Sequence, residues 1–202
     1  MLTIKESLVQ EEKILSSRFI GVLQPLLGAD FKEAKAKIEE LYPKATHYCY
    51  AYKKGANEGS SDDGEPSHSA GLPILNVLRG SGLDECAIFV VRYFGGTKLG
   101  LGRLTHAYSD LAKTLVAKAD PYEVATGRKT LLEVPYPSYD LVLDRAKRMG
   151  LEIEKPTFEE SIVLPVRADA TILSAFLALF PELRVAAEEE CFIYRRPSHD
   201  QG

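Results

Sequence analysis

The alternation of apolar and polar positions in the first half of the chain predicts strands interleaved with helices. Residues 16–27 and 47–53 are short runs rich in aromatic and β-branched side chains, as is typical of strands. Between them, Asp30 and Glu33 begin a stretch whose apolar positions share one helical face, and Pro43 ends that stretch. The pattern therefore predicts a strand, a capped helix and a second strand, in that order.

The next apolar segments predict a helix, a buried strand and a long helix. Residues 69–79 have helical spacing and are followed by Gly80 and Gly82, which favour a helix end. Residues 86–94 form a continuous apolar run that is typical of a central strand covered on both faces. Residues 104–119 then repeat apolar side chains at helical spacing, so we expect a long amphipathic helix.

A second unit begins near residue 127, and its pattern predicts the element order β-α-β-β-α-β. Its expected elements are short apolar segments at residues 129–134, 138–149, 151–157, 161–166, 170–180 and 185–194. This order is that of the ferredoxin-like split βαβ arrangement. We therefore expect an α+β chain with one domain at residues 1–125 and a ferredoxin-like domain at residues 126–202.

Composition and charge are those of an ordinary globular protein. The apolar share is 45% and the charged share 27%, close to the averages for folded domains. The chain has no run of roughly 18 apolar residues, and its first residues carry charges where a signal peptide would be apolar. We therefore expect a cytoplasmic protein without a membrane segment. The net charge of −4 provides no general attraction for RNA, so any contact with nucleic acid needs a local cluster of cations.

A polar loop over residues 55–67 carries the first candidate chemistry. The carboxylates of Asp62, Asp63 and Glu65 and the imidazole of His68 fall within seven positions. Such density suits Mg²⁺ or Mn²⁺, or a general acid/base pair, although the spacing is not that of an EF-hand. The alternative is structural, because aspartates in a loop often cap the following helix and accept hydrogen bonds from turn N–H groups.

The second candidate is the glycine-rich connection between the expected strand at 86–94 and the helix after it. Cations and backbone N–H groups at such a helix start can hold phosphate, and aromatic rings can stack on bases. The fingerprints of P-loop and dinucleotide-binding proteins are not matched, so ATP or NAD is not expected. The alternative is that the glycines only permit close packing. The candidate binding residues are Arg18, Arg92, Tyr93, Phe94, Gly95, Gly96, Lys98, Gly100 and Arg103.

Four ordered segments resemble the YigZ/IMPACT family, and together they spread over most of residues 16–119. They are SRF at 17–19, HYCYAY at 47–52, SDDGEP at 61–66 followed by AG at 70–71, and VRYFGG at 91–96 followed by KLG at 98–100. The chain departs from the usual pattern of that family at His68 and Arg103. These departures add an imidazole to the acidic loop and a cation to the glycine-rich connection.

The resemblance implies an N-terminal α/β two-layer domain like the second domain of the fifth small-subunit ribosomal protein. The C-terminal unit is similar to the small domain that bacterial members add, which resembles the last domain of elongation factor G. Eukaryotic members regulate translation initiation by binding the scaffold of the amino-acid-starvation kinase. The partners that the resemblance implies are therefore RNA, the ribosome or a translation-regulatory protein.

Three functions follow from these observations. The first, which we favour, is a translation-linked binding protein without catalytic activity or a cofactor. The second is a metal-dependent phosphohydrolase, in which Asp62, Asp63 and Glu65 hold Mg²⁺ or Mn²⁺ and His68 transfers a proton. The third is a protein-interaction module with an acidic surface. The sequence contains none of the usual hydrolase motifs, and it does not determine the oligomeric state.

Overall fold

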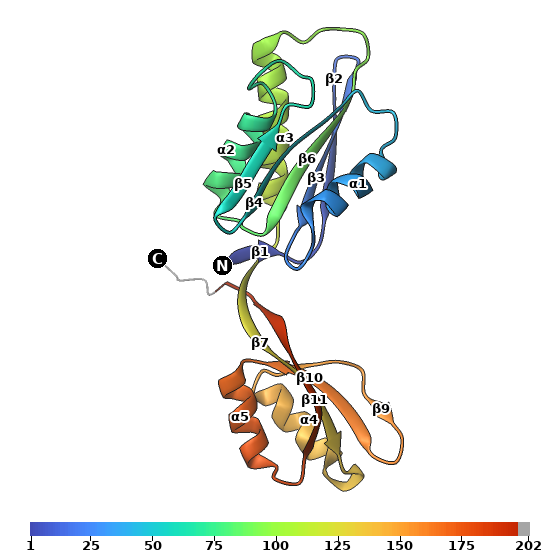
Figure 1. The fold of residues 1–202 in the computed structure, drawn as a ribbon, viewed down its shortest axis with the longest axis vertical. Helices are drawn as coiled ribbons and strands as arrows, with labels where there is room; N and C mark the ends of the chain where they lie inside the picture. The colour runs from blue at the N-terminus through green and yellow to red at the C-terminus, as the bar shows by residue number, and fades with distance from the viewer. Residues whose placement is uncertain (198–202) are drawn as a thin grey trace. The chain divides into compact units, whose positions relative to one another are not determined.

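The computed structural model of the chain describes residues 1–197 and contains, in that range, five α-helices and two β-sheets (Figure 1). The chain divides into two compact units, Met1–Glu123 with Arg196, and Val124–Arg195. The expectation of a mixed α and β structure is therefore confirmed. Residues 198–202, at the end of the expected second domain, lie outside the described residues.

The first unit is built on a five-stranded antiparallel sheet with the strand order β2-β3-β6-β4-β5. The central strand is buried along almost its whole length, because strands flank it on both sides and helices cover both of its faces. The strands of this sheet are β2 (Leu8–Ile14), β3 (Ser17–Pro25), β4 (His47–Lys54), β5 (Asn57–Ser61) and β6 (Cys86–Tyr93).

Helices lie on both faces of this sheet. The helices α2 (Gly71–Ser81) and α3 (Leu101–Lys118) pack together on one face, whereas α1 (Phe31–Leu41) packs on the other (Figure 1). The expected two-layer arrangement is therefore wrong in one respect, because α1 adds a third layer. Asp30 caps α1 as expected, since its side chain accepts hydrogen bonds from the backbone N–H groups of Lys32 and Glu33.

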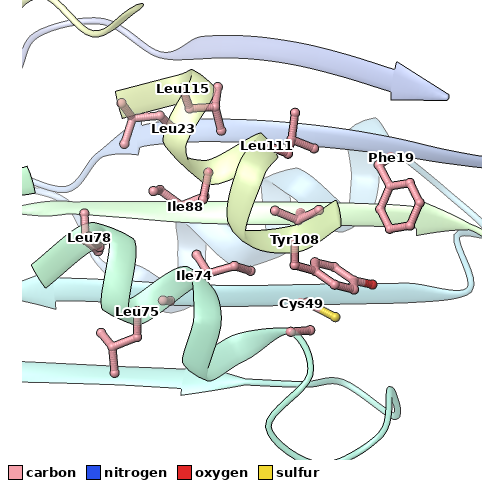
Figure 2. Packing of buried hydrophobic residues seen from close by; sticks show 14 of the residues in the cluster. Phe19, Leu23, Cys49, Ile74, Leu75, Leu78, Ile88, Tyr108, Leu111 and Leu115 are labelled. Atoms are coloured by element: carbon pink, nitrogen blue, oxygen red, sulfur yellow. The ribbon is translucent and has the colours of Figure 1, made fainter. Parts of the chain in front are cut away.

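The core beneath α2 and α3 is formed by side chains from both helices and from the sheet (Figure 2). Leu111 and Leu115 of α3 lie over β3, where a Cβ on Gly21 would stand only 2.8 Å from Leu115. The helix can therefore approach the strand closely at this glycine. Tyr108 projects from the same helix towards Phe19 and Cys49 in Figure 2.

The second unit has a sheet in which neighbouring strands follow the order β8-β10-β7, with β11 paired to β7 and β9 paired to β10. The expected strand at 151–157 is divided into β8 and β9, two short pieces. The short β1 (Leu2–Ile4) pairs with the beginning of β7. The other elements are β7 (Pro121–Val134), the 3₁₀ helix η1 (Tyr136–Ser138), α4 (Tyr139–Arg148), β8 (Glu152–Ile153), β9 (Thr157–Phe158), β10 (Ile162–Ala168), α5 (Ala170–Leu179) and β11 (Arg184–Arg195).

Three strands of the structure were not expected from the sequence. They are β1, β2 and β5, of which β2 and β5 form the two edges of the first sheet. Edge strands are half solvated and tolerate charged and polar residues, so they lack an apolar alternation. The segment Asn57–Ser61 lacks this alternation, so the sequence predicted a loop there. In the structure it forms β5, which pairs with β4. No helix within residues 1–197 is long and apolar enough to cross a lipid bilayer.

Candidate functional site

A cavity of about 410 Å³ lies in the first unit, beside the end of β6 and the start of α3. It brings together the two segments that carry candidate chemistry in the sequence, the acidic loop and the glycine-rich connection. Its walls are mostly apolar and include a few polar and charged groups. It is lined by Thr46, His47, Glu65, Pro66, Arg92, Phe94, Lys98, Leu99, Gly100, Leu101 and Leu104.

A buried ion pair joins the two segments at the wall of this cavity. The Nη1 atom of Arg92 donates to Oε1 of Glu65 over 2.6 Å. Arg92 is only 4% exposed and Glu65 only 9% exposed. Taking two charges out of water is costly, so such a pair needs close geometry and additional hydrogen bonds.

Further hydrogen bonds hold this ion pair in place. The Tyr108 hydroxyl donates to Oε1 of Glu65 over 2.6 Å, and Nη2 of Arg92 donates to Oγ of Ser17 over 3.3 Å. Burial raises the pKa of Tyr108 far above its ordinary value, so its hydroxyl keeps the proton that it donates. The carboxylate is thus fixed by α3 on one side and by β6 on the other.

The guanidinium of Arg92 also lies close to two aromatic rings. Its centre is 5.2 Å from the ring of Phe19 and 5.2 Å from the ring of Phe94, distances at which cation–π attraction operates. Within residues 1–197, Nε of Arg92 is buried and has no hydrogen-bond partner. The site therefore contains a positioned cation whose Nε–H group is unpaired within that range.

His47 lies next to this ion pair at the start of β4. Its Nδ1 atom is 2.8 Å from the backbone oxygen of Asp63, which can only accept, so Nδ1 carries a proton. Its Nε2 atom lies 3.8 Å from Oε2 of Glu65, beyond hydrogen-bond distance. The imidazole is therefore oriented with Nε2 towards the buried carboxylate.

The two aspartates of the acidic loop are engaged by backbone N–H groups. Oδ1 of Asp62 accepts from the N–H groups of Ala70 and Gly71 at the start of α2, and Oδ2 accepts from the N–H of His68. Oδ2 of Asp63 accepts a hydrogen bond from the backbone N–H of Tyr48 in β4 over 2.6 Å. Asp62 thus ties the loop to the start of α2, and Asp63 ties it to β4, as in the structural alternative considered above.

The hydrogen bonds to Asp62 also change the pKa of its carboxyl group. Burial by itself would raise this pKa, but the three backbone N–H groups favour the ionised carboxylate and together lower it below its ordinary value. Among residues 1–197, no group of three or more His, Cys, Asp or Glu side chains is arranged to hold a metal ion. Of the acidic-loop residues expected to act together, Glu65 alone lines the cavity, whereas Asp62, Asp63 and His68 do not.

The glycine-rich connection contributes cations and an open helix start. Lys98 is exposed and lines the cavity, and Gly100 is the N-cap residue of α3 with a φ of 79°. Within residues 1–197, no side chain accepts a hydrogen bond from the start of α3, and the first turn of this helix has no acidic residue. Because the first N–H groups of a helix lack partners within the helix, they offer a positive site for an anion beside Lys98.

Several of the expected binding residues lie away from the cavity. Arg18 makes a double hydrogen bond with Glu11, and its guanidinium lies 5.7 Å from the ring of Tyr93. Successive residues of a strand point to opposite faces, so Arg18 and Tyr93 do not share the face of Phe19 and Arg92.

The remaining expected residues belong to the backbone of the connection or to the surface. Gly95 allows a close chain crossing, because a Cβ there would lie 1.9 Å from the backbone oxygen of Ser16. Gly96 has a φ of 92°, which favours glycine. Arg103 is exposed in the first turn of α3 and does not line the cavity.

Three polar residues around the buried ion pair were not expected to belong to the site, namely Ser17, His47 and Tyr108. Tyr108 has the helical spacing of a core residue, and nothing in that spacing shows that its hydroxyl reaches Glu65. Ser17 and His47 occur in the segments that resemble the known family, so those segments were a usable signal. An arginine in an otherwise apolar central strand was a second signal, because a buried arginine requires a carboxylate partner.

Comparisons with known proteins identify the family. The model of the Impact N-terminal domain matches residues 15–116, which is half of the chain. This chain belongs to the IMPACT family. An IMPACT family member of Haemophilus influenzae is 36% identical over 182 residues, covering 87% of this chain and 88% of the relative. IMPACT family member YigZ of Escherichia coli is 35% identical over 183 residues, covering 87% of this chain and 79% of the relative.

A solved structure resembles this IMPACT family chain along nearly its whole length. It is described as the crystal structure of a hypothetical protein, with 28% identity and a TM-score of 0.59. The alignment covers 92% of this chain and 96% of the solved one. The matched family model spans the acidic loop, the glycine-rich connection and the cavity between them.

Proposed function

We propose that this IMPACT family member is a translation-linked RNA-binding protein, and that RNA phosphate binds at the rim of the cavity. The observation that carries the proposal is the uncapped start of α3 beside Lys98. Backbone N–H groups at a helix start and a nearby lysine form a suitable site for a phosphate oxygen. The link to translation rests on the resemblance to proteins that act on translation initiation.

The electrostatics of the cavity support an anionic ligand. Arg92 and Glu65 compensate each other, so Lys98 and the positive end of α3 remain as the uncompensated charges of the cavity wall. No first-turn acid opposes them. Because the net charge of the protein is −4, the rest of its surface does not attract RNA. Binding of RNA phosphate is therefore confined to this local positive region.

Two finer aspects of the fold belong to the same proposal. The strand order β11-β7-β10-β8 in the second unit, with helices between the strands, supports a ferredoxin-like domain. The first unit is proposed to share its fold with the second domain of the fifth small-subunit ribosomal protein. Kinship with ribosomal components is consistent with RNA as the partner, as an argument by analogy.

The test is co-sedimentation of the purified protein with bacterial ribosomes at low and high salt. We expect salt-sensitive pelleting, because release of counterions drives binding to phosphate. Lys98→Glu should weaken the pelleting and reduce its dependence on salt, whereas Lys37→Glu makes the same charge change on α1, on the opposite face, and should not. Pelleting that is equal for the wild type and Lys98→Glu would overturn the proposal.

Arg92 is unsuitable as a test position. Glutamate there would place a second carboxylate beside Glu65 in a buried region, and the folded state itself would be lost. Lys98 is exposed and makes no ion pair within residues 1–197, so its replacement changes the surface charge alone.

A further inference from the structure

The cavity beside α3 has an apolar wall and a polar wall of different character. Phe94, Leu99, Leu101 and Leu104 provide apolar surface. The polar wall is formed by His47, Glu65 and Arg92, all held by the contacts described above. A ligand that fills the cavity must therefore present an apolar face and a hydrogen-bonding edge.

Phe94 is positioned to stack against a flat ligand. The residue is 41% exposed, and the guanidinium of Arg92 lies 5.2 Å from the centre of its ring. Its backbone N–H donates to the hydroxyl of Thr46 over 2.9 Å, which fixes the chain at this point. The aromatic side chain is thus held in place while much of its surface stays accessible.

The polar wall retains hydrogen-bonding capacity. Nε of Arg92 has no hydrogen-bond partner within the described part of the chain, although the residue is only 4% exposed. Among residues 1–197, the two side-chain hydrogen bonds that the carboxylate of Glu65 accepts both go to Oε1, and Nε2 of His47 lies 3.8 Å from Oε2. A buried guanidinium and carboxylate with unused capacity indicate a ligand that carries both acceptors and donors.

We propose that this cavity receives one unpaired nucleotide of an RNA strand. The base enters the cavity against Phe94 and meets His47, Glu65 and Arg92 with its polar edge, while its phosphate lies at Lys98 and the start of α3. A volume of about 410 Å³ is within the range of small-ligand pockets, about 300 to 1,000 Å³. The inference rests on the proposed RNA binding and narrows it to single-stranded RNA.

Base pairing decides whether a base can reach this cavity. In a duplex both faces of a base are stacked and its edge is paired, so a protein can reach it only by unstacking and unpairing it. An unpaired base is free to enter and stack on an aromatic ring. The geometry therefore favours single strands, loops or strand ends over a continuous helix.

The experiment compares the affinity of the full chain for one labelled RNA oligonucleotide, alone and annealed to its complement, by fluorescence anisotropy. We expect the single strand to bind at least about fivefold more tightly, because stacking of one base on an aromatic side chain contributes that much. Phe94→Leu keeps apolar volume but removes the aromatic face, and should abolish the preference. Phe158→Leu, at an exposed phenylalanine of the second unit, should retain it.

The outcomes separate this inference from the proposed function. Equal affinity for single and double strands, with both weakened by Lys98→Glu, would leave RNA binding intact and overturn the nucleotide cavity. An unchanged preference in a folded Phe94→Leu variant, verified by its thermal unfolding, would also overturn it. Failure of every RNA to bind the wild type would overturn the proposed function and this inference together.

Discussion

The helices α2 and α3 lie side by side on one face of the first sheet, yet their N-termini are completed in different ways (Figure 1). At α2, Asp62 accepts hydrogen bonds from the N–H groups of Ala70 and Gly71, at 3.0 and 2.8 Å. At α3, the N-cap residue is Gly100, no side chain of the described residues accepts a hydrogen bond from the first turn, and Lys98 lines the same cavity. The carboxylate of Asp62 thus compensates the positive N-terminus of α2, whereas the N-terminus of α3 has no such carboxylate within residues 1–197 and lies at a cavity.

The difference originates in the loops that precede the two helices. The loop before α2 supplies a carboxylate, which satisfies the helix start and fixes the loop. The loop before α3 supplies a cation and glycines, which add positive charge and leave the backbone N–H groups accessible. The same element of structure thus serves stability in α2 and is available for a ligand in α3.

The buried ion pair connects these two helix starts. Glu65 belongs to the loop that caps α2, and Arg92 belongs to the strand that leads to α3. Tyr108, from α3 itself, donates to the same carboxylate. A change in this pair should therefore affect both starts at once.

The largest effect is expected from Glu65→Ala. This variant leaves the guanidinium of Arg92 buried without its counter-charge, and breaking such a pair reduces the free energy of unfolding by about 3–5 kcal/mol. Unfolding by urea, followed by circular dichroism, measures the loss.

Two control variants test whether the loss comes from an unpaired buried charge. One removes both charges of the buried pair, and the other breaks an exposed ion pair. The double variant Glu65→Leu with Arg92→Leu removes both charges and should recover most of the lost stability. Glu11→Ala breaks the exposed pair with Arg18 and should leave the unfolding midpoint unchanged. If Glu65→Ala is as stable as Glu11→Ala, the buried ion pair does not stabilise the folded protein, and the prediction is wrong.

A smaller effect is expected at the capped start of α2. Asp62→Asn keeps the size of the side chain but removes its charge and replaces one of its two accepting oxygens by a donating NH₂ group, so one hydrogen bond is lost and the free energy of unfolding falls by about 0.5–1.5 kcal/mol. The pKa of Asp62 is lowered in the folded protein, so the unfolded chain takes up this proton at a higher pH than the folded chain. The stabilisation is therefore complete above the unfolded pKa of about 3.9 and is lost as the pH falls through the folded pKa.

Unfolding measured at a series of pH values tests this prediction. The stability difference between the wild type and Asp62→Asn should be constant near neutral pH and should shrink below about pH 4. Asp110→Asn serves as the control, because that aspartate forms an exposed ion pair on α3, which contributes little to stability, so the difference from the wild type should be small at every pH. A difference that persists unchanged in acid would exclude the carboxylate charge as the cause.

The sequence predicted most helices and strands of the first unit because their apolar periods are regular. It did not predict β5, whose residues Asn57–Ser61 are polar and pair with β4 along one edge only. Nor did it predict that α1 would cover the second face, although the continuous apolar run at 86–94 indicated a strand buried on both faces. A strand that is buried on both faces needs an element on each face, so this apolar run indicates a third layer.

The candidate site could be predicted only in part, because its decisive contacts are tertiary. Arg92 and Glu65 were both singled out, but no local pattern shows that residues in a strand and in a distant loop form an ion pair. Tyr93 was placed with Arg92 although neighbouring residues of a strand point to opposite faces. Tyr108 was expected in the core, and only the structure shows its hydroxyl at the carboxylate.

The smallest effect, and the most direct test of the comparison, is expected from giving α3 the acidic start that α2 has. Leu101 is the first residue of α3, is 61% exposed and lines the cavity. Aspartate there interacts favourably with the helix dipole by about 0.3–1 kcal/mol, so the protein should be as stable as the wild type or slightly more so. The same charge repels phosphate, so the affinity for RNA should fall by roughly twofold to fivefold.

Leu101→Asn is the matched control, because it has nearly the same shape as Leu101→Asp without the charge. RNA binding measured by anisotropy should be weaker in Leu101→Asp than in Leu101→Asn, with a larger difference at low salt than at high salt. If both variants bind equally, the loss comes from the missing leucine and not from the helix start. In that case the open start of α3 would differ from that of α2 in structure without serving a ligand.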